Sequence, residues 1–131
     1  MSKKLILLAA LAQGGCAVAT GSNMAQLQAS DWQLQGATGD TFTLHVADGK
    51  VAGKGACNRF FGAITKQGDG VLALGPMGAT RMMCIGDQMG KEMEYLQTLE
   101  KVASYTINGN QLTLSDANKA ELLTFNAVPA K

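Results

Sequence analysis

The chain has 131 residues, about the length of one domain, and it is 47% apolar and 16% charged. That composition is too apolar for a disordered chain, and 16 glycines indicate many turns. The 11 Lys and Arg residues nearly balance the 10 Asp and Glu residues, and no block of like charge exists, so no nucleic-acid-binding surface is expected.

The N-terminal segment has the composition of an export signal. Lys3 and Lys4 precede an apolar run over residues 5–12, and small residues follow. The run is too short to remain as a membrane-spanning helix. We therefore expect the chain to leave the cytoplasm.

Cys16 is the expected site of lipid attachment. Gly14 and Gly15 stand directly before it, as in a bacterial lipoprotein signal, whose cysteine is acylated and becomes the new N-terminus. Gln13 departs from that pattern, because an aliphatic residue is usual three places before the cysteine. Residues 1–15 are thus expected to be a lipoprotein-type export signal. A plain secretory cleavage nearby and a retained N-terminal segment remain open.

Residues 16–30 are small and polar and have no persistent period, so they are expected to form a flexible tether. A tether of this length reaches roughly 20 Å. It would hold the domain at a membrane surface in the cell envelope, facing the periplasm, with the outer membrane preferred over the inner. Without the lipid the chain would be secreted or periplasmic.

The chain has three cysteines, an odd number for an exported protein. Acylation of Cys16 would remove the odd one and leave Cys57 and Cys84 as a pair. In an oxidising envelope this pair is expected to form a disulfide. The alternative is two buried free thiols that pack as small apolar residues.

Local patterns predict strands in the first half of the domain. Residues 41–46 alternate apolar and polar side chains, as a half-buried strand does. Asp48 and Gly49 then predict a tight hairpin turn. Gly53 and Gly55 in the returning strand suggest a bulge or a close approach of another group to the backbone.

Residues 87–102 carry the one clear helical pattern, with Asp87 as its cap. Glu92 lies off the apolar stripe that this pattern predicts, which consists of Met89, Met93, Leu96, Leu99 and Val102. Three short strands follow within residues 105–125. Strands, one helix and more strands, without βαβ alternation, predict an α+β fold: a small antiparallel sheet or partly closed β-barrel packed with a single α-helix.

Two sequence blocks, GACNRFFG at 55–62 and GATRMMC at 78–84, carry a resemblance to a known family. The chain resembles the META domain family, the family of the HslJ-like heat-shock proteins of bacterial envelopes, over about residues 32–125. The resemblance depends on Trp32, Gly53, Gly55, Cys57, Asn58, Arg59, Phe60, Gly62, Pro76, Met77, Thr80, Arg81, Met82 and Cys84. Phe61 departs from the family pattern, in which a small or polar residue is common at that place.

The resemblance implies a META domain over residues 31–127, followed by a C-terminal tail at 128–131. It also implies a small α+β fold, no established enzymatic activity and no cofactor. Members of the family are associated with stress responses, envelope integrity and tolerance of some antibiotics.

Catalysis by Cys57 would need a base, and the only histidine is His45, on the strand face opposite the core residues. A Cys57–His45 pair requires one particular hairpin register, so no enzyme is expected. The two arginines of the blocks, Arg59 and Arg81, could hold an anionic ligand, but we expect each to bond backbone carbonyls near a turn. Asn58 is expected to be a turn or bulge residue.

Five methionines fall within residues 77–93, beside Cys84. Their helical spacing favours core packing, so no metal site is expected. Soft sulfur ligands in the envelope nevertheless leave a periplasmic Cu(I)-binding protein as the alternative function. The preferred interpretation is a non-enzymatic, monomeric, lipid-anchored envelope protein that acts by binding or scaffolding an unidentified envelope protein.

Overall fold

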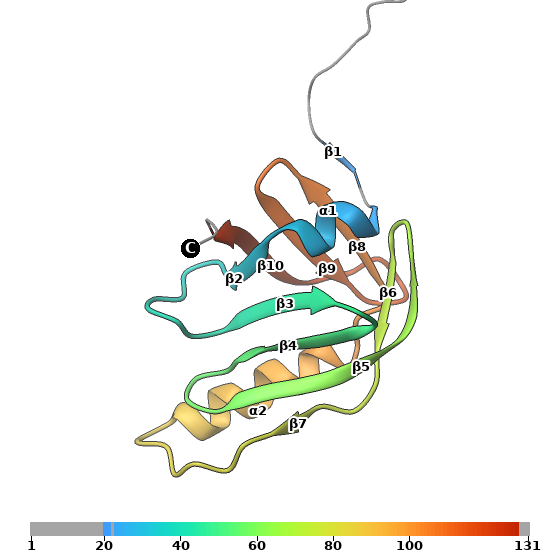
Figure 1. Ribbon diagram of the computed structural model, residues 1–131. Coiled ribbons are helices and arrows are strands. Elements are labelled where there is room, and N and C mark those ends of the chain that lie inside the picture. The colour runs from blue at the N-terminus through green and yellow to red at the C-terminus, as the bar shows by residue number, and fades with distance from the viewer. Residues whose placement is uncertain (1–19, 22, 129–131) are drawn as a thin grey trace, which may run out of the picture.

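The computed structural model describes residues 20–21 and 23–128, and it is a closed antiparallel β-barrel (Figure 1). Around the barrel the strands follow the order β8, β6, β5, β4, β3, β2, β10, β9, and β9 returns to β8. Their bounds are β2 (Asp31–Leu34), β3 (Thr43–Ala47), β4 (Lys50–Lys54), β5 (Arg59–Gly68), β6 (Val71–Leu74), β8 (Ser104–Asn108), β9 (Gln111–Ser115) and β10 (Glu121–Val128). Two short strands are added at the edges: β1 (Thr20–Gly21) pairs with β8, and β7 (Gly78–Ala79) pairs with β5.

The expected antiparallel barrel with a packed helix is confirmed in outline. The barrel is closed rather than partly open, because β8 pairs with β9 along its length and with β6 through Ser104 and Val71. The fold is mostly β structure.

The predicted hairpin between β3 and β4 is confirmed. Asp48 and Gly49 both have positive φ, 56° and 75°, as the tight turn that matches strand twist requires. The predicted close approach at Gly53 is also present, because a Cβ there would collide with the carbonyl oxygen of Thr43 on β3. Glycine at this position therefore allows β3 and β4 to lie close together.

Helix α2 (Gln88–Leu99) lies where the sequence predicts a helix, but the face that it buries differs in part from the predicted one. Its buried residues are Glu92, Tyr95 and Leu99, whereas Met89 and Met93 are 41% and 55% exposed. The expected stripe is therefore wrong for Met89 and Met93, whereas Leu99 and Val102 are buried and Leu96 packs against the core as expected. The hydrogen-bonded carboxylate of Glu92 turns inward and brings Tyr95 into the core with it.

Tyr95 links α2 to the barrel through an aromatic cluster. Its ring meets Phe42 and Phe60 edge to face, with ring centroids 5.3 and 5.7 Å apart, and its hydroxyl donates to the carbonyl oxygen of Thr43 at 2.8 Å. Burial raises the pKa of Tyr95, so the hydroxyl stays neutral and keeps its proton for this bond. In Figure 1, α2 lies against the β3–β5 side of the barrel.

A short second helix, α1 (Met24–Ala29), corrects the expected tether at 16–30. Asn23 caps it by accepting a hydrogen bond from the backbone N–H of Gln26 at 2.8 Å. Leu27 is fully buried, and the indole of Trp32 donates to its carbonyl oxygen at 2.9 Å. The folded domain thus includes α1 and extends before the expected boundary at residue 31.

The expected export signal at 1–15 and the lipid site at Cys16 lie outside the described residues, as do residues 129–131 of the expected tail. Val128, the first residue of that tail, ends β10 instead. Within residues 20–21 and 23–128, neither helix has the length and apolar character needed to cross a membrane.

Replacement of Leu27 tests whether this segment is part of the fold. Leu27→Ala should lower the free energy of unfolding by about 2–5 kcal/mol, because it leaves a cavity under α1. The measurement is urea unfolding followed by circular dichroism. The exposed neighbour change Gln28→Ala is the control and should have little effect. A Leu27→Ala chain as stable as the native one would restore the tether interpretation.

Candidate functional site

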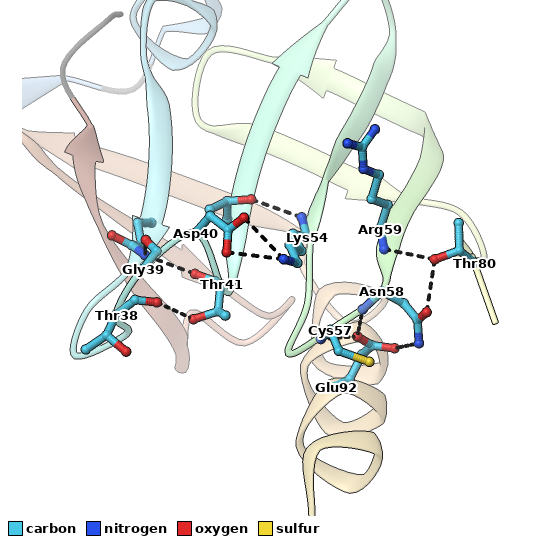
Figure 2. A network of polar contacts seen from close by, with 12 residues as sticks. Thr38, Gly39, Asp40, Thr41, Lys54, Cys57, Asn58, Arg59, Thr80 and Glu92 are labelled. Carbon is cyan, nitrogen blue, oxygen red and sulfur yellow. Dashed lines mark hydrogen bonds and ion pairs between the residues drawn. The ribbon is translucent and has the colours of Figure 1, made fainter. Parts of the chain in front are cut away.

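A buried carboxylate joins α2 to the turn between β4 and β5. Oε1 of Glu92 accepts hydrogen bonds from the backbone N–H groups of Cys57 at 3.0 Å and Asn58 at 2.7 Å, and Oε2 accepts from the Asn58 amide at 2.8 Å (Figure 2). Glu92 is 3% exposed and Asn58 is 1% exposed. We call this arrangement the Asn58–Glu92 cluster.

Gly55 makes room for the cluster. A Cβ at Gly55 would lie 2.6 Å from Cγ and 2.8 Å from Oε1 of Glu92, closer than real Cβ atoms come to such neighbours. The close approach that the sequence suggested at Gly55 is therefore confirmed. The approaching group, Glu92, was missed, because a charged residue on a helix is ordinarily assigned to the solvent face.

Asn58 also holds the second block. Its side-chain oxygen accepts from the backbone N–H of Met82 at 2.7 Å and from the hydroxyl of Thr80 at 3.0 Å. That hydroxyl oxygen in turn accepts from the backbone N–H of Arg59 at 3.1 Å (Figure 2). Asn58 lies in a turn, as expected, but its main role is to link the blocks 55–62 and 78–84.

The disulfide between Cys57 and Cys84 joins the same two blocks covalently, with the Cα atoms 6.2 Å apart. The expected pairing is thus present, and the alternative of two free thiols is not. For a sequence separation of 27, the chain-entropy estimate gives a stabilisation of about 3.5 kcal/mol. Cys57 has no free thiol to pair with His45, because its sulfur is in the disulfide, and Nδ1 of His45 lies 2.6 Å from Oδ1 of Asp31.

The hydrogen bonds keep Glu92 ionised. Burial by itself raises the pKa of this carboxyl group, but the backbone N–H groups of Asn58, Cys57 and Ala56 and the side-chain amide of Asn58 together lower it further than burial raises it. The pKa of Glu92 therefore lies below its ordinary value. The site thus holds a buried charge that is compensated by donors rather than by a cation.

Residues 82–85 lie in an exposed loop that consists mainly of apolar residues, and we call this segment the apolar loop. Met82, Met83 and Ile85 are 55%, 99% and 85% exposed. Core packing was expected for the methionines, and it is wrong for these two as well as for Met89 and Met93. Met77 alone of the five packs against the core. The hydrogen bond that the backbone N–H of Met82 donates to Asn58 and the disulfide at Cys84 hold the loop backbone at the surface.

The remaining motif residues shape the strands around the cluster. Phe60 is 2% exposed and lies in the core. A Cβ at Gly62 would lie 2.6 Å from the sulfur of Met77, and a Cβ at Gly78 would lie 2.6 Å from the ring of Phe61. These glycines therefore let Met77 and Phe61 pack closely over the neighbouring backbone.

Arg59 and Arg81 are both exposed. Within the described part of the chain, neither guanidinium bonds a backbone carbonyl, so the expected role of these side chains in tying strand ends together is wrong. The backbone of Arg59, and not its side chain, connects the two blocks: its carbonyl oxygen accepts a hydrogen bond from the backbone N–H of Thr80 at 2.9 Å.

The fold and the cluster define a small β-barrel domain whose motif residues form one cross-linked structural centre. The pattern of the META domain family matches residues 25–129, and the chain belongs to that family. A search of curated proteins found no match.

Two solved structures share the fold. One, an NMR structure of a protein, is 27% identical, covers 78% of this chain and 92% of its own, and has a TM-score of 0.58. The other, an NMR structure of a protein from Burkholderia xenovorans, is 24% identical, covers 85% of this chain and 82% of its own, and also has a TM-score of 0.58.

Replacement of the buried carboxylate tests the cluster through pH. Glu92→Gln should lower the free energy of unfolding at pH 7 by about 1–3 kcal/mol, because the amide accepts fewer hydrogen bonds and turns an N–H toward other donors. A lowered folded-state pKa stabilises the fold above the unfolded pKa, and this stabilisation is lost as the pH falls through the folded value. The difference between native and Glu92→Gln chains should therefore shrink on acidification below about pH 4.5.

Urea unfolding between pH 3 and 7 measures this difference. Glu94→Gln, a change at an exposed position of the same helix, is the control and should follow the native curve. A gap between native and Glu92→Gln that stays constant over the whole range would contradict the compensated charge.

Proposed function

We propose that the chain is a non-enzymatic, monomeric, lipid-anchored domain of the bacterial envelope that binds an envelope protein and thereby supports stress resistance. The observation that carries this proposal is that both cysteines of the motif blocks and the buried carboxylate of Glu92 are already used in the fold. Cys57 and Cys84 share a disulfide, and Glu92 accepts hydrogen bonds with both oxygens. The apolar loop, which the disulfide helps to hold in place, stays exposed to solvent.

The apolar loop has the properties of a contact surface. Large apolar side chains exposed together are unusual on a monomer unless they meet another molecule, and Met83 and Ile85 are the most exposed large apolar residues in the described part of the chain. Methionine side chains adapt to irregular surfaces. Because the loop is held at Met82 and Cys84, little backbone entropy is lost when it binds.

The position of the loop supports an outward-facing role. In Figure 1, β1 lies at one end of the barrel, and the loop between β7 and α2 lies at the opposite end. With Cys16 acylated, the apolar loop would face away from the membrane. A periplasmic protein, rather than the anchoring bilayer, is therefore the proposed partner.

The Cu(I) alternative has less support. Both candidate thiolates are consumed in the disulfide, which leaves thioethers as the only soft ligands near 77–93. Across the residues that the structure describes, no group of three or more His, Cys, Asp or Glu side chains is placed to hold a metal.

Lipid attachment is tested with a radioactive fatty acid in growing cells. The native chain should be labelled and Cys16→Ser should not, because acylation requires the thiol. Gln13→Leu, which restores the usual aliphatic residue of the signal, is the positive control. An unlabelled native chain beside a labelled Gln13→Leu chain would refute the anchor and leave secretion.

The contact surface is tested in vivo by a photo-crosslinking residue placed at Met83 or, as the control, at the exposed turn residue Asn118. Position 83 should give one discrete product with an envelope protein, and position 118 should not give it. In cells that lack the native gene, the double variant Met83→Ser/Ile85→Ser should fail to restore growth under heat or antibiotic stress. Full restoration by this variant, or the same product from both positions, would contradict the proposal.

A further inference from the structure

A groove of about 710 Å³ lies on the outer face of β2–β5, away from the apolar loop. Its middle is shallow because Ala52 of β4 presents only a methyl group. The strand register places His45 on one side of Ala52 and Phe61 on the other. Two residues further along, Lys54 of β4 is paired with Arg59 of β5, so these cationic side chains stand at one end of the groove.

The charges of the groove are paired with one exception. Asp31 lies 2.6 Å from Nδ1 of His45, and Asp40 lies 3.2 Å from Nζ of Lys54. The guanidinium of Arg59 has neither an ion pair nor a hydrogen bond within residues 20–21 and 23–128. Figure 2 shows it extended away from Asn58 and Thr80, on the side opposite the Asn58–Glu92 cluster. Asp31 and Asp40 balance Lys54 and Arg59 in number, and the guanidinium of Arg59 is the one cationic group of the groove lining that no carboxylate contacts within the described residues.

An exposed aromatic ring accompanies that charge. Phe61 is 57% exposed and lies two residues from Arg59 on the same face of β5, a separation of about 7 Å along a strand. Its ring rests against the backbone at Gly78, where a side chain would collide with it. The ring therefore has a supported position beside the free guanidinium.

We propose that this groove binds a small organic anion with a flat apolar body, such as an aromatic carboxylate. The carboxylate would accept two hydrogen bonds from the guanidinium of Arg59. The apolar body would lie over Ala52 and against the ring of Phe61. This site is separate from the apolar loop and does not depend on the proposed envelope partner.

The test is titration of the purified full chain with 1-naphthoate, followed through backbone amide NMR shifts. Saturable shifts are expected at Ala52, Lys54 and Phe61. The uncharged analogue 1-naphthalenemethanol should bind at least about tenfold more weakly, because it lacks the charge-assisted hydrogen bonds. Arg59→Gln should weaken naphthoate binding by a similar factor.

Arg81→Gln is the matched control, since Arg81 is also exposed but does not line the groove. It should bind naphthoate as the native chain does. Phe61→Leu, which keeps the guanidinium, should weaken the binding of both probes. The proposal is overturned if naphthoate does not saturate, if the shifts are confined to residues 82–85, or if Arg59→Gln and Arg81→Gln bind equally well.

Discussion

The carboxylate of Glu92 is the constraint on which the rest of the motif region depends. Removing a charge from water is costly unless hydrogen bonds replace the lost hydration, and here the backbone of Cys57 and Asn58 and the Asn58 amide supply them. The arrangement requires the absence of a side chain at Gly55. It also fixes which face of α2 meets the barrel, and so places Tyr95 in the aromatic core.

This constraint explains how the cysteines, Asn58 and the buried Glu92 are all used within the fold. Asn58 connects the cluster to the second block by accepting a hydrogen bond from the backbone N–H of Met82. The disulfide to Cys84 connects the same two blocks covalently. The same links leave residues 82–85 at the surface. In this member of the META domain family the two motif blocks thus form one structural centre, and the proposed recognition surfaces lie outside it.

The features predicted correctly from the sequence have local causes. The Asp48–Gly49 hairpin follows from turn chemistry, and the disulfide follows from the number of cysteines in a chain that is expected to be exported. The buried face of α2 was not predictable in this way, because periodicity treats Glu92 as a solvent-facing residue and its donors lie 34 and 35 residues away. Helix α1 was missed because only Leu27 of that segment is buried. Closure of the barrel could not be predicted from local patterns, because it depends on the pairing of β8 with both β6 and β9.

The most direct test of the Asn58–Glu92 cluster is an NMR titration of the Glu92 carboxyl carbon in the native chain. The account predicts a pKa below the ordinary glutamate value of about 4.3, with the amide signals of Cys57 and Asn58 changing at the same midpoint, because these groups donate to that carboxylate. A pKa at or above the ordinary value, or amide signals of Cys57 and Asn58 that do not follow the titration, would contradict the account.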